Sequence, residues 1–252
     1  MAGDEDRARP TSVRWWNRLL DPSRIAVEAV DKQLGPAWRR VSQGESRLAV
    51  SIGVFAAIGL EAALPNRVAH GQRWATAIVA TLLLIGIVMA NPTRINRRSP
   101  RLRAATLALV ALLSAGNMAS GARLIVDLVH AQGIRDPGKL LLTGGAIWFT
   151  NVIVFALWYW EFDRGGPVAR ALAPRPYPDF LFPQMASPEM APPGWEPNFT
   201  DYFYTSFTNA TAFSPTDVMP LSRWAKLTML VQSAISLMLA ALVIARAVNV
   251  LH

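Results

Sequence analysis

The hydrophobic positions of the chain are gathered into five long runs with few polar interruptions. They are Leu48–Leu64, Trp74–Ala90, Ala104–Val129, Leu140–Trp160 and Leu221–Leu251. Each is near or above the roughly 17–25 residues that cross about 30 Å of hydrocarbon at 1.5 Å per residue. Helices on the surface of a soluble protein alternate polar and apolar faces, which these runs hardly do. The pattern predicts an all-α polytopic integral membrane bundle with five transmembrane helices.

A sixth apolar segment is too short to cross a membrane. The stretch TDYFYTSFTNATAFSPTDVMP (200–220) predicts a short helix over Phe199–Thr211 and a proline-broken loop over 212–220, directly before the last long run. Non-helical backbone at membrane depth occurs only where it is buried in protein or lines a water-filled cavity. The layout therefore predicts one re-entrant pore helix.

The remaining segments are polar or rich in proline. Residues 163–198 hold nine of the eighteen prolines, which excludes helices and central strands there. We expect an extended linker packed on the protein through Phe180, Leu181, Phe182 and Trp195. Residues 1–47 form an N-terminal segment with short amphipathic helices at 11–20 and 21–35, which lie either in the headgroup layer or against the bundle.

Three parts follow along the chain. After the N-terminal segment comes a three-helix membrane domain over 48–130. A pore-like unit over 140–252 comprises an outer helix (140–160), the linker (163–198), the pore helix (199–211), the filter-like loop (212–220) and an inner helix (221–251).

Basic residues are unevenly distributed between the apolar runs. Segment 91–103 carries five Arg and no acidic residue, residues 1–47 carry eight Arg and one Lys, and segments 65–73 and 131–139 carry two basic residues each. Cytoplasmic loops of membrane proteins are enriched in Lys and Arg, so we expect the first two inside and the last two outside. This distribution predicts a multi-pass protein of the cell membrane, in contact with the lipid bilayer, with a cytoplasmic N-terminus.

Composition excludes several kinds of chemistry. The net charge of +8 is explained by the cytoplasmic loops and requires no nucleic acid. Cysteine is absent, which excludes disulfides, thiolate metal sites and thiol nucleophiles. The three histidines, at 70, 130 and 252, are too dispersed for a metal cluster. Without a phosphate-binding loop, a His-Glu-x-x-His motif or a serine elbow, we expect no enzyme and no cofactor.

The short helix and the loop after it contain aromatic, hydroxyl and acidic residues in a characteristic order. Tyr202-Phe203-Tyr204-Thr205-Ser206-Phe207 is followed by Thr208 and Thr211, and then by Asp217 and Pro220. This order resembles the pore unit of tetrameric potassium-channel-like proteins, which comprises an outer helix, a pore helix, a filter closed by Asp-x-x-Pro, and an inner helix. The resemblance implies a homotetramer and a monovalent cation as the permeant ion.

The filter itself departs from that family. Gly-Tyr-Gly is missing, and Ala212–Thr216 stands in its place with one extra residue. A selective carbonyl ladder needs positive φ, which glycine supplies and proline prevents. The resemblance then implies passive cation conduction through a non-standard filter of hydroxyls, a few carbonyls and an acidic ring. Its residues are Thr208, Thr211, Ala212, Phe213, Ser214, Pro215, Thr216 and Asp217.

Nearly the whole chain also resembles a bacterial multi-pass membrane family, a domain of unknown function. The shared parts are Pro178-Asp179-Phe180-Leu181-Phe182-Pro183, Asp201-Tyr-Phe-Tyr-Thr-Ser-Phe-Thr208, Ser214-Pro-Thr-Asp217 and Ser222-Arg223. This resemblance implies the architecture and the bacterial inner membrane, and it carries no activity.

The number of transmembrane helices before the short helix determines from which side of the membrane the re-entrant loop enters. With four spans before it, the loop enters from the cytoplasmic side, which resembles the inverted arrangement of ionotropic glutamate receptors. Alternatively, one of the four helices does not cross, and the loop enters from outside.

A few polar residues fall inside the predicted spans. Arg123 and Asp127 are four apart and can pair, either on an ion path or as a salt bridge that orients a packed helix. Asn151 needs a partner in hydrocarbon. Gln232, Ser233 and Ser236 either face a pore axis or serve helix packing.

Two other functions stay open at this stage. The loss of every filter glycine is also compatible with a non-conducting membrane scaffold or assembly subunit of the same architecture. A secondary transporter ranks lower, because the sequence has no inverted repeat or paired broken helices.

Overall fold

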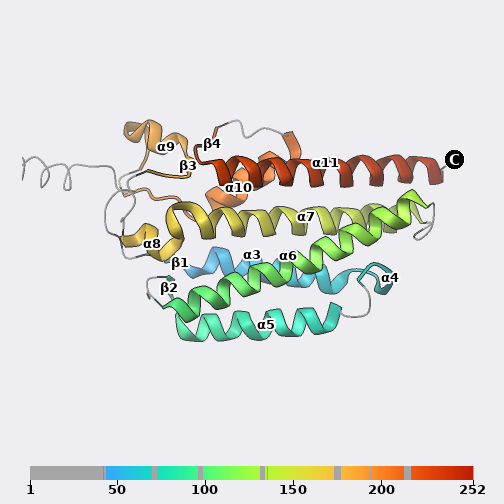
Figure 1. Cartoon of the computed structure of the whole chain (residues 1–252), viewed down its shortest axis with the longest axis horizontal. Helices are drawn as coiled ribbons and strands as arrows, with labels where there is room; N and C mark the ends of the chain where they lie inside the picture. Colours follow the sequence, from blue (N-terminus) through green and yellow to red (C-terminus); the bar gives the residue numbers. More distant parts are fainter. Residues whose placement is uncertain are drawn as a thin grey trace, which may run out of the picture.

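The computed structural model describes residues 42, 44–69, 73–95, 99–130, 134, 136–172, 177–192, 194–212 and 217–251. The predicted amphipathic helices at 11–20 and 21–35 lie outside these ranges. Five long helices form an elongated bundle (Figure 1): α3 (Arg47–Ala63), α5 (Arg73–Ala90), α6 (Pro100–Val129), α7 (Pro137–Phe162) and α11 (Arg223–Leu251). Their bounds agree with the five apolar runs to within four residues at each end.

Among the described residues, six shorter helical segments accompany the long helices. They are α4 (Asn66–Ala69), η2 (Asp163–Gly165), α8 (Pro167–Leu172), α9 (Pro183–Ala186), η3 (Pro188–Met190) and α10 (Phe199–Ala212). Two antiparallel strand pairs complete the fold: β1 (Glu45–Ser46) with β2 (Arg94–Ile95), and β3 (Phe180–Leu181) with β4 (Met219–Pro220).

The helix starts follow local sequence rules. Ser99 caps α6 and is followed by Pro100, and Asp136 caps α7 by accepting a hydrogen bond of 2.7 Å from the Lys139 backbone N–H. Proline suits the first helical position because its missing N–H would have no partner there. These caps explain why both helices start a few residues before their apolar runs.

Within the described part of the chain, three helices are long and apolar enough to cross a membrane by length and composition. They are Pro100–Val129, Arg223–Val250, and Pro137–Leu172, which joins α7 to η2 and α8. A shorter apolar helix covers Trp74–Ala90. The outward faces of the bundle expose large apolar side chains, among them Met89 and Leu142. An exposed apolar surface of this extent marks contact with a membrane or with other protein.

Helix α7 is the centre of the bundle. It packs against α3, α6, α10 and α11, and most of its side chains are buried. Gly144 brings α7 close to α11, because a Cβ built on it would lie 2.7 Å from a methyl group of Val243. Small residues allow helix backbones to approach in this way.

One end of the bundle gathers most of the described basic residues. The starts of α3, α6 and α11 lie there with the end of α7, as the β1–β2 pair and the ring contact of Phe162 with Trp224 show (Figure 1). We call this the Arg-rich end after Arg47, Arg94, Arg101, Arg103, Arg164, Arg170 and Arg223. The termini of α7 and α11 at the opposite end carry fewer basic residues, such as Lys139 and Arg246.

The proline-rich linker is helical in short pieces, so the prediction that it holds no helix is wrong. Helices α8, α9 and η3 start at Pro167, Pro183 and Pro188. Proline disrupts a helix interior but is tolerated in the first turn, which is where these prolines lie. The expected packing is confirmed, since Phe180 and Phe182 are almost fully buried and Leu181 and Trp195 pack against the core.

The α7–α11 contact yields a matched pair of substitutions. Gly144→Ala should lower the free energy of unfolding by about 1–3 kcal/mol, because the added methyl overlaps the buried Val243 side chain. Gly145→Ala meets no atom within 4 Å and should stabilise the helix by up to about 1 kcal/mol. Thermal unfolding of both variants in detergent measures the contrast, and equal effects would contradict the close approach.

Candidate functional site

The half-length helix α10 starts at the Arg-rich end. The Phe199 backbone N–H donates to Glu45 Oε1 at 2.5 Å, and the Phe199 ring contacts the Trp160 ring at 6.3 Å. The ring also reaches the backbone of α3, because a Cβ on Gly53 would lie 2.7 Å from it. The first turn of α10 is therefore held between α3 and the last turns of α7.

The other end of α10 lies at the middle of the bundle. The rings of Phe203 and Phe207 contact Phe149 and Trp148 at 6.0 and 5.9 Å. These two partners are halfway along α7 (137–162). After the loop, β4 pairs with β3 at the Arg-rich end, where α11 begins (Figure 1). Helix α10 thus starts at one end of the bundle and reaches only its middle, and β4 lies at that same end again.

Hydrogen bonds fasten α10 to both of its long neighbours. Ser206 Oγ donates to the Val152 carbonyl of α7 at 2.7 Å. Asn209 Nδ2 donates to the Met229 carbonyl of α11 at 3.0 Å and to Gln232 Oε1 at 2.9 Å. Gln232 Nε2 in turn donates to Ser206 Oγ at 2.7 Å.

Further polar groups extend these contacts. Tyr159 Oη donates to Gln232 Oε1 at 2.5 Å, and Ser233 Oγ donates to Asn209 Oδ1 at 3.1 Å. Asn151 Nδ2 donates to Ser236 Oγ at 3.3 Å. We call these seven side chains the polar network: Asn151, Tyr159, Ser206, Asn209, Gln232, Ser233 and Ser236.

Six of the seven side chains of the polar network are buried within a single chain, and Ser233 is half-buried. Gln232 and Ser236 are fully buried, and Ser206 has no exposed surface either. Buried polar groups without partners cost several times more than paired ones, so a network with these bonds fixes one arrangement of α7, α10 and α11. For Gln232, Ser233, Ser236 and Asn151 this position favours helix packing over a pore-facing role.

The opposite face of α10 is exposed. It presents Tyr204, Phe207 and Thr211, with Thr208 partly covered. The Thr208 and Thr211 hydroxyls donate to carbonyls of their own helix, those of Tyr204 and Phe207, at 3.0 and 2.9 Å. Exposed Asp217, after the loop, accepts a hydrogen bond from Tyr204 Oη at 3.3 Å.

Part of the predicted filter lies outside the described residues. The structure does not describe Phe213, Ser214, Pro215 and Thr216. It describes Ala212 only as the last residue of α10. Of the predicted ion-path residues, the structure brings Thr208, Thr211 and Asp217 to one exposed face.

Asp127, which the sequence suggested could pair with Arg123, forms its ion pair with another residue. Asp127 pairs with Arg67 of α4 at 3.3 Å and not with Arg123. On α6, Asp127 is buried and Arg123 is exposed, so their side chains occupy different environments. The pair lies at the end opposite the Arg-rich end, where it holds α4 against α6.

A second buried cluster anchors α10 at the Arg-rich end. The Arg170 guanidinium of α8 donates to the carbonyls of Trp160 and Asp163 at 2.5 and 3.2 Å. It lies 3.6 Å from Glu45 Oε2 and 5.0 Å from the centre of the Tyr202 ring, a cation–π distance. Tyr202 Oη donates to Asp163 Oδ2 at 2.6 Å. The guanidinium therefore links α7, α8, β1 and α10.

The linker joins the same cluster through Asp179. Its carboxylate accepts from the Arg164 backbone N–H and from Trp224 Nε1 of α11, both at 2.8 Å. The turn that makes this possible has φ values of 51°, 90° and 98° at Arg164, Gly165 and Gly166. Such values are unfavourable for residues with a Cβ, and the two glycines accommodate two of the three.

Several members of both clusters carry no signal in the sequence that we used for prediction. Tyr159, Ser206 and Asn209 were not predicted as site residues, although Ser206 and Asn209 are three apart and share a face of α10. That spacing, on an otherwise aromatic helix, was the available signal. The roles of Arg170 and Asp163 depend on the linker turn, which no local pattern predicts.

No family model, curated protein or solved structure matches the chain. Among the described residues, no group of three or more His, Cys, Asp or Glu side chains could hold a metal ion.

The polar network can be tested at its centre. Gln232→Leu removes the acceptor for Tyr159 and Asn209 and the donor to Ser206, and should cost about 1–3 kcal/mol of unfolding free energy. Ala234→Leu, at an exposed position of the same helix, should change it by less than about 0.5 kcal/mol. Unfolding in detergent compares the two, and an unaffected Gln232→Leu protein would contradict the network.

The Glu45 contact makes a prediction about pH. Burial raises the pKa of the Glu45 carboxyl above its ordinary value of 4.5, while Arg170 and the hydrogen bonds from Trp160 and Phe199 offset part of this effect. The folded state therefore favours the proton, and this contribution to stability is complete below pH 4.5 and lost as the pH rises through the raised pKa.

Glu45→Gln removes that titration. The melting temperature of the unmodified protein minus that of Glu45→Gln should fall as the pH rises above 4.5, and then level off. Glu189→Gln, at an exposed position, should run parallel to the unmodified protein at every pH. If the melting temperature of the unmodified protein minus that of Glu45→Gln rose with pH, the raised pKa of Glu45 would be contradicted.

Proposed function

We propose that the chain is the subunit of an oligomeric cation channel with five transmembrane helices, in which α10 is a re-entrant pore helix. The spans would be α3, α5, α6, α7 and α11. The observation that carries the proposal is that α10 enters the bundle at the Arg-rich end and stops at its middle, while β4, which follows the loop, lies at the Arg-rich end again.

The two faces of α10 support this function differently. Its buried face is fixed to α7 and α11 by the polar network, so the helix is held rigidly at half depth. Its exposed face presents Thr211 and, after the loop, Asp217. The C-terminal end of a helix carries partial negative charge, which favours a cation at the position where α10 stops.

The side of entry follows from the charges. The Arg-rich end is cytoplasmic by the preference of basic residues for that side, and α10 starts there. This supports the inverted arrangement, in which four spans precede a loop that enters from the cytoplasm.

Conduction through this arrangement requires several copies. The exposed face of α10 lies on the outside of a single chain, so neighbouring subunits would have to enclose the path. The order α7, α10, loop and α11 resembles the pore unit of potassium-channel-like proteins, and by that resemblance the assembly is a homotetramer. Lacking the filter glycines, it would select cations by hydroxyls and the Asp217 ring.

Ion flux tests the proposal directly. Purified protein in sealed liposomes should dissipate a potassium gradient, and Asp217→Asn should lower the flux or its preference for cations over anions several-fold, because it removes the acidic ring. Glu189→Gln neutralises another exposed carboxylate of the chain and should leave the flux unchanged.

Two results would contradict the channel. One is the absence of any flux from liposomes in which correct insertion has been verified. The other is a monomeric particle by mass photometry in the same lipid or detergent, which would favour a non-conducting scaffold.

A further inference from the structure

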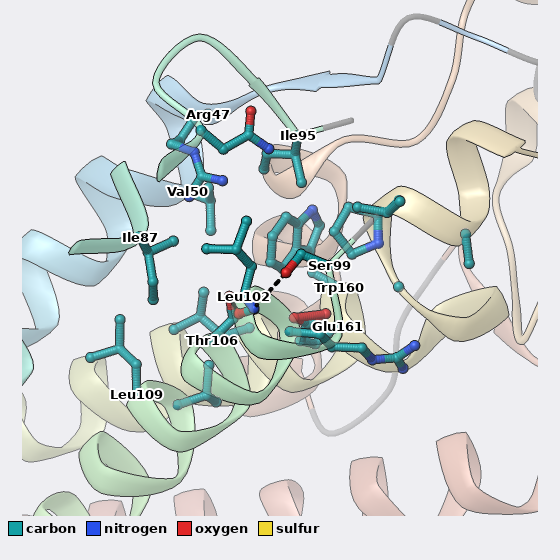
Figure 2. Close-up of a pocket in the computed structure, with 18 of the residues that line it drawn as sticks. Arg47, Val50, Ile87, Ile95, Ser99, Leu102, Thr106, Leu109, Trp160 and Glu161 are labelled. Atoms are coloured by element: carbon teal, nitrogen blue, oxygen red, sulfur yellow. Dashed lines mark hydrogen bonds between the residues drawn. The ribbon is translucent and has the colours of Figure 1, made fainter. Parts of the chain in front are cut away.

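A large cavity opens at the Arg-rich end, away from α10. It has a volume of about 670 Å³ and lies between α3, α5, α6, α7 and α8. Figure 2 shows Arg47 and Ile95 at one side, Trp160 and Glu161 at another, and apolar Val50, Ile87 and Leu109 along the walls. This volume lies within the roughly 300–1,000 Å³ that is typical of small-molecule sites.

Arg47 is the unusual group in the cavity. The residue is only 9% exposed, and its buried Nε has no hydrogen-bond partner within the described part of the chain. Among the described residues no carboxylate forms an ion pair with it. A buried cation is costly unless an anion or a set of acceptors compensates it. The cavity beside it has room for that anion.

The carboxylate that lines the cavity has cations of its own nearby. Glu161 is buried and lies within electrostatic reach of Arg170 and Arg103. Arg103 is exposed at the cavity's edge. Arg47 therefore remains as the group that calls for a ligand, and Asn91, an amide that can donate hydrogen bonds, lines the same cavity.

The shape of the cavity fits a chain attached to that anion. Its lining on α6 runs from Ser99 to Val110, which is about 16 Å of helix at 1.5 Å per residue. Half of a bilayer's hydrocarbon core is about 15 Å thick. The cavity thus extends from a basic, polar end to apolar walls over the depth of one leaflet.

We propose that this cavity is a binding site for an anionic phospholipid of the leaflet at the Arg-rich end. The phosphate binds the Arg47 guanidinium, and one acyl chain lies between α3, α5 and α6 against Val50, Ile87 and Leu109. Arginine suits phosphate because its planar fork donates two parallel hydrogen bonds. Basic pockets between transmembrane helices bind anionic head groups for the same reason.

This occupant is preferred to a soluble anion or a zwitterionic lipid on the chemistry of the walls. Inorganic phosphate would satisfy Arg47 but leave the apolar depth unfilled. A zwitterionic head group carries an ammonium group besides its phosphate, and this positive charge would be repelled by the arginines of the Arg-rich end. The site does not depend on conduction, so its test is independent of the proposed channel.

Native mass spectrometry of the detergent-solubilised full chain provides the test, with phosphatidylglycerol as the probe. We expect phosphatidylglycerol to bind at least about tenfold more tightly than phosphatidylcholine, a difference of about 1.4 kcal/mol. Arg47→Gln should remove most of that preference. Arg101→Gln, an exposed arginine at the same end, is the matched control and should retain it.

A second variant addresses the acyl chain and protects against misfolding of Arg47→Gln. Thr106→Phe places a ring in the cavity and should weaken phosphatidylglycerol binding without lowering the melting temperature. Equal affinity for the two lipids, or equal loss in Arg47→Gln and Arg101→Gln, would overturn the proposal. So would displacement of the bound lipid by inorganic phosphate or by equimolar oleate, since either would make the phospholipid dispensable.

Discussion

The burial of the Arg170 guanidinium is the constraint on which the Arg-rich end of the bundle depends. A charge removed from water is tolerated only when its donors find acceptors, and removing one partner of a buried pair typically costs about 3–5 kcal/mol. The partners of Arg170 come from the last turn of α7, from β1 and from the ring of Tyr202 in α10. Compensating one cation therefore also sets where the half-length helix starts.

The polar network performs the corresponding task at the far end of α10. Apolar contacts alone let a helix rotate or slide, because they are not directional. Hydrogen bonds from Ser206 and Asn209 to backbone carbonyls of α7 and α11 specify both depth and rotation. A helix that reaches only the middle of the bundle depends on such directional bonds for its position.

The sequence predicts much of this architecture and little of its cross-links. Apolar runs predict the helix bounds well, because each long helix of the bundle carries apolar side chains along its whole length and the runs end where the helices end. The helices that begin at Pro167, Pro183 and Pro188 were not predicted, because a high proline content indicates non-helical structure. Proline is nevertheless tolerated in the first turn of a helix, and that is where these prolines lie. Pairings such as Tyr159 with Gln232, or Asp127 with Arg67, join residues at least sixty positions apart, and local spacing carries no information about them.

Glu45 has a mechanical consequence for the half-length helix. Its carboxylate accepts a hydrogen bond from the first N–H of α10, while its backbone belongs to the strand that leads the N-terminal segment into α3. A displacement of β1 is therefore transmitted directly to the start of α10 by the Glu45 side chain. Strand β1 and the half-length helix are therefore mechanically coupled at the Arg-rich end.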